Sequence, residues 1–169
     1  NTTLQPRLLA VDAGVLAARG AFRIKGAPGW EALQVRPDAG AGEAIPAFVD
    51  ENTLLWALKR KVGDVLSYTD ENGRTFDVKL VGALPDSLFQ GHVIIDEARF
   101  LEKFPSSPGY SLFLADAKTT GPGLAGVRDR LRTAASDTGA RVELTRDVLA
   151  AFHQIENTYI AIFTVLGTL

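Results

Sequence analysis

The sequence predicts an α+β fold, made of a small β-rich lobe and a strand–helix–strand lobe. Two stretches carry this prediction: Val62–Leu84 has the pattern of a β-hairpin, and Tyr110–Leu144 follows the pattern of a strand, a helix and a strand. The turn-forming run Pro105–Gly109 separates them. With 169 residues, of which 46% are hydrophobic, the chain is long enough to bury a sizeable core.

The hairpin is the best-defined element of the first lobe. Its arms are Val65–Thr69 and Thr75–Leu84, and in the second arm apolar residues alternate with charged ones, as in a half-buried strand. Residues 70–73, Asp-Glu-Asn-Gly, join the arms, and Asn-Gly tolerates the positive φ angles of a tight hairpin turn. Gly82 allows a bend or a bulge near the end of the second arm.

The rest of this lobe is predicted from short apolar runs bounded by glycine, proline and cap-forming residues. Some of these runs favour buried strands, and others favour helices or turns. The expected strands are Leu8–Val11, Ile45–Val49 and His92–Ile95; the other segments are Asp12–Ala18 (helix or turn), Trp30–Val35 (helix or strand), a helix from Asp50 or Asn52 to about Lys61, and Glu97–Phe104 (helix capped by Asp96).

In the second lobe, strands are expected at Tyr110–Ala115 and Arg141–Leu144, on either side of a helix at Leu124–Thr138. Such a unit is most simply a right-handed parallel crossover. Thr145 can cap a final helix that runs to the end of the chain. The two lobes are therefore expected to differ, with a hairpin in one and a crossover in the other.

Composition and charge bear on several classes of function. The 18 basic and 20 acidic residues give a net charge of −2, which does not favour nucleic-acid binding. The run Lys59–Lys61 is typical of a solvated helix end, where cations suit the helix dipole. Because cysteine is absent, disulfides, thiol catalysis and cysteine metal sites are excluded. Methionine is also absent, so we expect the chain to be part of a longer protein.

One glycine-rich motif has the spacing of a dinucleotide-binding loop. Gly121–Gly126 matches G-x-G-x-x-G between an expected strand and an expected helix, and Glu143 lies at about the spacing of a ribose-binding acid. However, Asp116–Thr120 separates the strand from the loop, and Pro122 removes an N–H group from the turn that would face phosphate. The motif therefore favours a Gly/Pro loop that enters a helix, and we expect no bound nucleotide.

The sequence indicates no metal site and no catalytic group. Its histidines are His92 and His153, whereas a zinc site usually needs three or four ligands. No serine lies in a G-x-S-x-G elbow. We therefore predict no catalytic, cofactor-binding or metal-binding residues.

The C-terminal run Thr158–Leu169 has no charged residue and would be apolar on every side of a helix. Such a helix is either fully buried in a protein core or the beginning of a membrane span. A span needs roughly 20 apolar residues, and about twelve are present here. The composition of the run leaves both interpretations open.

Six stretches, taken in order, carry a resemblance to a known family. They are Arg7–Asp12 (RLLAVD), Ile45–Val49 (IPAFV), Val62–Gly82 with its GD, NG and LVG elements, Phe89–Phe104, Tyr110–Asp116 (YSLFLAD) and Val142–Gly167. Their order resembles the extracytoplasmic domain of FtsX/MacB-type ABC transporter permeases. The last stretch resembles that family most, because there a helix leaves the soluble domain and becomes a membrane helix.

The resemblance implies a layout with respect to a membrane. Residues 1–156 would form a domain on the periplasmic or extracellular side of the cell (inner) membrane, with lobes at roughly 1–108 and 109–156. Residues 157–169 would begin a transmembrane helix. The implied partners are the membrane, the transmembrane helices of the same permease, a separate cytoplasmic ATPase subunit and a second permease copy or subunit.

The resemblance also implies a non-enzymatic function. The domain would couple ATPase-driven motion of the membrane helices to the handling or export of a lipid, a lipoprotein, a peptide or a partner protein, which is mechanotransmission. The alternatives are a nucleotide-binding α/β enzyme domain that uses Gly121–Gly126, and a plain protein-interaction domain. The expected coupling element is the last helix, with apolar residues at helical spacing: Val148, Phe152, Ile155, Tyr159 and Phe163.

Overall fold

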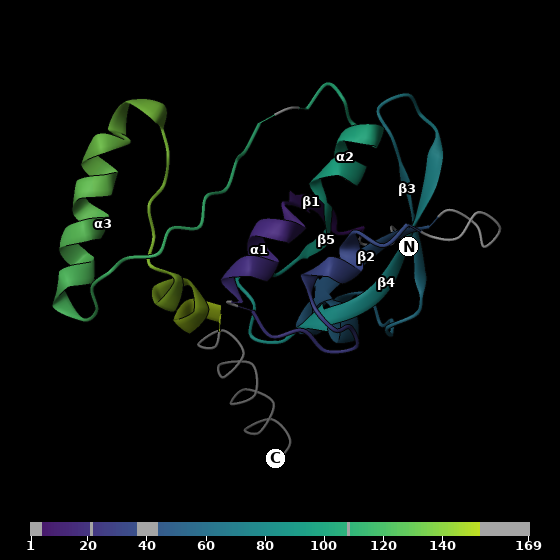
Figure 1. Ribbon diagram of the computed structural model, residues 1–169, viewed down its shortest axis with the longest axis horizontal. Helices are drawn as coiled ribbons and strands as arrows, with labels where there is room; N and C mark the ends of the chain where they lie inside the picture. Colours follow the sequence, from purple (N-terminus) through teal and green to yellow (C-terminus); the bar gives the residue numbers. More distant parts are fainter. Residues whose placement is uncertain (1–4, 21, 37–43, 108, 153–169) are drawn as a thin grey trace, which may run out of the picture. The chain divides into compact units, whose positions relative to one another are not determined.

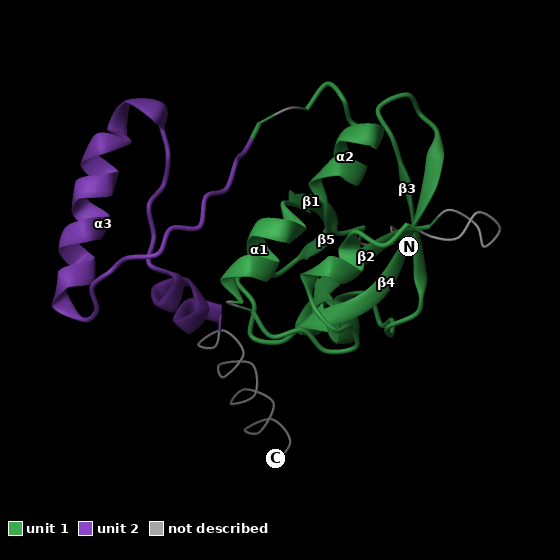
Figure 2. Cartoon of the chain, in the orientation of Figure 1, with its two compact units in different colours: residues 1–109 green, residues 110–169 purple. Residues whose placement is uncertain are grey.

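The computed structural model describes residues 5–20, 22–36, 44–107 and 109–152 of the chain. The chain forms two compact units, Asn1–Gly109 and Tyr110–Leu169, which Figure 2 shows in different colours. The first unit holds a five-stranded sheet, and the second holds a long helix. The predicted α+β class is confirmed.

Figure 1 shows the helices and strands along the chain. Every strand predicted for the first unit is present, and Trp30–Val35, for which the sequence favours no single element, contains a 3₁₀ helix. The elements are β1 (Arg7–Val11), α1 (Ala13–Arg19), η1 (Trp30–Leu33), β2 (Ile45–Asp50), η2 (Thr53–Ala57), β3 (Val65–Thr69), β4 (Thr75–Leu84), β5 (His92–Asp96), α2 (Glu97–Lys103), α3 (Pro122–Ala134) and η3 (Ser136–Thr138).

The sheet is mixed, with the strand order β1-β5-β2-β4-β3. β1 runs parallel to β5 and β2 parallel to β4, whereas the β5–β2 and β4–β3 pairs are antiparallel. Two hydrogen bonds join the segment before β1 to the opposite edge: Gln5 Nε2 donates to the Ser67 carbonyl at 2.7 Å, and the Tyr68 hydroxyl donates to the Pro6 carbonyl at 3.0 Å. The sheet therefore curls until its two edges meet at one end.

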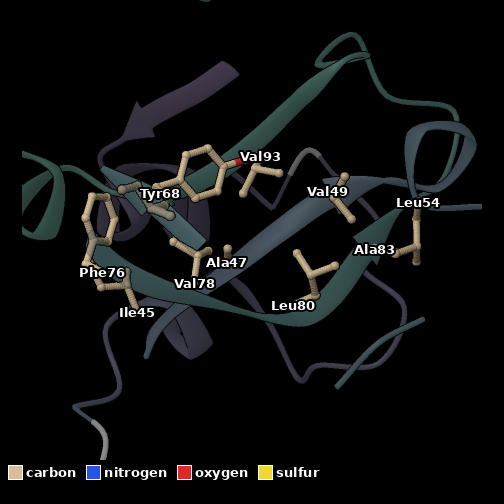
Figure 3. Packing of buried hydrophobic residues seen from close by; sticks show 11 residues of the cluster. Ile45, Ala47, Val49, Leu54, Tyr68, Phe76, Val78, Leu80, Ala83 and Val93 are labelled. Carbon is tan, nitrogen blue, oxygen red and sulfur yellow. The ribbon is translucent and has the colours of Figure 1, made fainter. Parts of the chain in front are cut away.

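The core of the first unit lies on both faces of β2. All the residues of β2 are buried, as expected for a strand that is covered on both sides. On one face, the ring centroids of Trp30 and Phe48 are 5.5 Å apart in an edge-on arrangement. On the other face lies the cluster of Figure 3: Ile45, Ala47, Val49, Leu54, Tyr68, Phe76, Val78, Leu80, Ala83, Val93 and Ile95.

The helix predicted after β2 is shorter than expected. The sequence predicts a helix to about Lys61, but η2 ends at Ala57. The Leu58 N–H donates to the Thr53 carbonyl at 2.9 Å, which is a π-helical bond between residues i and i+5. Lys59 then adopts a φ of 52°, in the left-handed region, and this ends the helix.

The predicted hairpin is present, with Thr69 opposite Thr75. Asp70 organises its turn, because the Asp70 Oδ1 atom accepts from the N–H groups of Asn72 at 2.9 Å and Arg74 at 2.8 Å. Gly73 has a φ of 78°, as predicted, whereas Asn72 lies outside the positive-φ region. The connection is thus a loop of residues 70–74 closed by a carboxylate.

Gly73→Val should destabilise the first unit by about 1–3 kcal/mol, because a β-branched side chain resists positive φ. A Cβ atom at this position would meet no atom within 4 Å, so the backbone alone is the source of the cost. Urea denaturation measures the change, with Gly73→Asn as the matched control, since asparagine tolerates this region. An unchanged midpoint for Gly73→Val would show that the turn is wrongly assigned.

Gly82 lies at a bulge, as predicted. The register of β2 against β4 shifts so that Phe48 pairs with Gly82 and one residue of β4 is passed over. A Cβ atom on Gly82 would lie 2.9 Å from the Phe48 ring and 3.0 Å from the Lys25 carbonyl oxygen. Glycine is therefore required here by the close approach of a ring and a second backbone segment.

Tyr68 makes the stability of the first unit depend on pH in alkaline solution. Burial raises the pKa of Tyr68 from 10.0 to about 12. The folded state therefore holds the phenolic proton more tightly than the unfolded state does. This contribution to stability is complete below pH 10 and is lost as the pH rises from 10 to about 12.

We expect Tyr68→Phe to remove a loss of stability on the order of 2–3 kcal/mol that the unmodified chain suffers between pH 10 and pH 12. Chemical denaturation in that range measures it. Tyr110→Phe is the control, because Tyr110 is exposed. An equal alkaline loss in the unmodified chain and in Tyr68→Phe would contradict the raised pKa.

The second unit contains the predicted helix, α3, but not the two predicted strands. Neither Tyr110–Ala115 nor Arg141–Leu144 forms a strand, so the strand–helix–strand lobe and its crossover are wrong. An apolar run forms a stable strand only where a partner strand satisfies its backbone groups. The described residues of this unit provide no such partner, and the side chain of Phe113 is 78% exposed.

Candidate functional site

The predicted coupling helix begins within the described part of the second unit. Residues 145–152 are helical, and the Leu144 carbonyl accepts from the N–H groups of Asp147 at 2.9 Å and Val148 at 3.2 Å. Leu144, and not Thr145, therefore occupies the N-cap position. Val148 and Phe152 are half-buried and lie one helical turn apart on the same side.

The exposed side of this helix is charged, whereas its half-buried side is apolar, so the helix is amphipathic in its first turns. Arg146 and Asp147 are exposed and form an ion pair, with 3.3 Å between Arg146 Nε and Asp147 Oδ1. The other predicted coupling residues, Ile155, Tyr159 and Phe163, lie outside the described residues. None of the helices in the four described ranges is both long and apolar enough to cross a membrane.

The glycine-rich loop does not follow a strand in the described structure. Gly121, with a φ of 59°, is the N-cap of α3, and Pro122 is the first residue of that helix. A Cβ atom on Gly123 would overlap Thr119 Oγ1, so this glycine lets the loop pack against itself. The strand from which a dinucleotide fingerprint turns is missing among residues 109–120. The geometry is that of a loop in which a glycine and a proline begin a helix.

We expect calorimetric titration of the chain with NAD, ATP or zinc to show no micromolar binding. Pro122 has no N–H group to offer a phosphate, and the chain has no cysteine ligand. Micromolar binding of NAD or ATP that Gly121→Ala removes would favour the nucleotide-binding alternative. Zinc binding that His92→Ala removes would show a metal site.

His92, the histidine within the described residues, belongs to no cluster of metal-ligating side chains there. His92 lies at the start of β5, where its Nδ1 atom is 2.8 Å from the Gln90 carbonyl oxygen. His153 lies outside the described residues. Within the part of the chain that the structure describes, no three histidine, aspartate or glutamate side chains gather closely enough to hold a metal ion.

An open depression on the first unit is lined by charged residues that neutralise one another. Lys25 Nζ lies 2.7 Å from Glu51 Oε1, and Arg23 lies 3.5 Å from Asp86 across the same depression. Each cation already has an anionic partner. The depression therefore offers little net charge with which to hold an ionic ligand.

Asp50 is the most constrained polar side chain of the first unit, and the sequence indicated it only as one of two caps. It is 2% exposed. Its Oδ1 atom accepts from the Thr53 N–H at 2.8 Å, and its Oδ2 atom accepts from the Gly91 N–H at 2.9 Å. Asp50 therefore caps η2 and also ties it to the loop before β5. The contact with Gly91 is long-range, so no local pattern could have revealed it.

Comparisons with protein-family models, with curated proteins and with solved structures found no match to this chain.

Proposed function

We propose that the chain is a non-enzymatic, extracytoplasmic domain of an FtsX/MacB-type ABC transporter permease. In this proposal it transmits motion of the membrane helices, driven by a separate cytoplasmic ATPase, to a lipid, lipoprotein, peptide or protein that is handled or exported. Its partners are the transmembrane helices of the same permease, the ATPase and a second permease copy or subunit. It lies on the periplasmic or extracellular side of the cell membrane.

The helix that begins at residue 145 is the observation that carries this proposal. Val148 and Phe152 are half-buried, which supports docking of one side of the helix on its own unit. Further along the sequence, beyond Asn157, the charged residues stop. An apolar face that gives way to an uncharged run is the pattern of a helix passing from a protein surface towards lipid.

The packing of the first unit also suits a role in transmitting force. β2 is buried throughout, and the sheet edges are joined through Gln5 and Tyr68. Close-packed interiors have low compressibility and transmit displacement rather than absorb it. A rigid unit of this kind transmits displacement to a partner that is bound to it.

A plain protein-interaction domain is the second candidate, and a specific observation favours it. Tyr110 and Phe113 are 63% and 78% exposed, and their ring centroids are 6.1 Å apart. Aromatic side chains that are exposed together are common in protein interfaces. The same pair could serve the permease domain as the contact for a partner protein.

Cysteine labelling in intact cells tests the proposed location. The chain contains no cysteine, so Arg74→Cys, at the exposed hairpin turn, introduces a single thiol in a cysteine-free full-length background. A membrane-impermeant maleimide should label this thiol without permeabilisation. Val78→Cys is the matched control, since Val78 is fully buried and should react only after unfolding. Labelling of Arg74→Cys only in permeabilised cells would refute the proposal.

A further inference from the structure

The end of η2 and the residues after it expose apolar and cationic side chains that are close together in the sequence. We define the Trp56 loop as residues 55–62. Trp56 is 76% exposed and Leu55 is 50% exposed, and the three cations Lys59–Lys61 that follow are also exposed. A tryptophan is usually largely buried, because its ring carries a large apolar area.

Hydrogen bonds from main-chain N–H groups hold the Trp56 loop in place, one to a carbonyl and one to a side-chain carboxylate. The Arg60 N–H donates to the Leu54 carbonyl at 3.0 Å, and the Lys61 N–H donates to Asp64 Oδ2 at 3.1 Å. After the loop, the Gly63 N–H donates to the Leu80 carbonyl of β4 at 2.7 Å. At the start of η2, Asp50 accepts hydrogen bonds from the Thr53 and Gly91 N–H groups. The Trp56 loop is therefore held in one conformation by its contacts with the core.

The charge of the Trp56 loop is opposite in sign to that of the whole chain. No ion pair of Lys59, Arg60 or Lys61 occurs with any described residue. Asp64 is the acidic residue that follows them, so residues 55–64 carry three positive charges and one negative charge, or +2, against −2 for the chain. The positive charge of the Trp56 loop therefore favours an anionic partner.

We infer that the Trp56 loop docks on the surface of an anionic lipid bilayer, with Trp56 and Leu55 at the level of the headgroups and Lys59–Lys61 against the lipid phosphates. Tryptophan is enriched at membrane–water interfaces because its ring is amphipathic, and cations beside it are attracted by anionic lipids. A protein partner would instead place charge at the rim and exclude it from the centre of the contact. Here the cations lie within a few residues of the ring.

Docking of this kind is weak in isolation and effective when the domain is already held near a membrane. Each cation near an anionic surface contributes about fivefold, so the three together contribute about 100-fold. Attachment of the same chain to the bilayer would raise the effective concentration of the loop at the surface. The inference goes beyond the proposed function, and the test below does not depend on the sidedness or transport activity of the full protein.

Fluorescence of Trp56 tests the inference directly. The chain has two tryptophans, and Trp30→Phe leaves Trp56 as the only one. Trp30 is 3% exposed and its Nε1 atom has no hydrogen-bond partner among the described residues, so phenylalanine keeps an aromatic ring against Phe48 and breaks no hydrogen bond. With vesicles of phosphatidylglycerol and phosphatidylcholine, Trp56 emission should shift to the blue and be quenched by brominated acyl chains. Phosphatidylcholine alone, or about 1 M salt, should largely remove both effects.

Matched variants separate the loop from other membrane contacts of the chain. Neutralising Lys59, Arg60 and Lys61 with glutamine should lower the ratio of inserted to free Trp56 about 100-fold. Neutralising Arg74, Lys118 and Arg130, which are exposed elsewhere, changes the net charge equally and should leave the ratio unchanged.

Two results would overturn the inference. One is an unchanged Trp56 emission in the presence of anionic vesicles, which would leave the Trp56 loop as a surface for an acidic protein. The other is an equal effect of the two sets of glutamine substitutions, which would show that only net charge matters. Neither result bears on the cysteine labelling above, so the two proposals can fail separately.

Discussion

A flexible Gly/Ser linker inserted after Asn157 should abolish transport by the full-length protein, while the domain still folds and the protein still enters the membrane. In the proposed mechanism, one continuous helix is held by the second unit at Val148 and Phe152 and by lipid at its other end. A helix rises 1.5 Å per residue and is stiff over a few turns, so a displacement at one end reaches the other. A flexible linker absorbs that displacement. Transport assays in reconstituted vesicles measure the loss.

A second insertion at the same position separates stiffness from length. A linker of about seven residues rich in alanine, glutamate and lysine forms about two helical turns and keeps the faces of the helix nearly aligned. We expect this helical insert to keep a substantial part of the transport that the flexible insert of equal length removes. Full transport with the flexible insert would reject the lever mechanism, and equal loss with both inserts would show that length, not stiffness, is the cause.

Asp50→Ala should lower the free energy of unfolding of the first unit by about 2–4 kcal/mol. The substitution leaves the buried Thr53 N–H without its partner and removes one of the two acceptors of the Gly91 N–H, whose other acceptor is Thr53 Oγ1 at 3.0 Å. A buried donor that loses its partner costs about 1–3 kcal/mol, and bonds to a charged acceptor are at the upper end. Urea denaturation at neutral pH measures the change.

Two further substitutions serve as controls for the effect of Asp50→Ala on stability. Asp50→Asn keeps one acceptor oxygen and should cost about half as much as Asp50→Ala. Asp77→Ala removes an exposed carboxylate that accepts from Ser67 Oγ at 2.7 Å, and it should change the stability by less than about 0.5 kcal/mol. A similarly small effect for Asp50→Ala would contradict the role of Asp50 as the tie between η2 and the loop before β5.

The sequence was most informative where local pattern and tertiary environment agree. The alternation in β4 predicted the hairpin because one face of that strand is buried, and the positive φ of Gly73 followed from Asn-Gly. The cap of α2 by Asp96 followed from local chemistry, with the Ala98 N–H 3.1 Å from Asp96 Oδ1. These features need only neighbouring residues.

Features that depend on long-range contacts were not predictable in this way. The parallel pairing of β2 with β4 and the bond from Gly91 to Asp50 join residues far apart in the sequence. The apolar composition of Tyr110–Ala115 favours a strand, but composition cannot supply the partner strand that would satisfy its backbone. The exposure of Trp56, which lies within η2, depends on how that helix packs on the sheet and could not be predicted from local pattern.

For the proposed site, the sequence placed the beginning of the coupling helix within one residue of where it lies. It also predicted an apolar side of this helix, from the helical spacing of Val148, Phe152 and the apolar residues after them. The half-buried positions of Val148 and Phe152 agree in spacing with the proposed apolar side.

Energy transfer from the coupling helix to the bilayer tests the central claim most directly. Ala151 is exposed on the helix of residues 145–152, so Ala151→Cys in the cysteine-free full-length protein can carry a donor dye, with acceptor dyes on the lipids. The lever mechanism predicts that the transfer efficiency changes when the ATPase is held in its ATP-bound state, and that the flexible insert after Asn157 removes this change. The same efficiency in the nucleotide-free and ATP-bound states of the uninterrupted protein would contradict it.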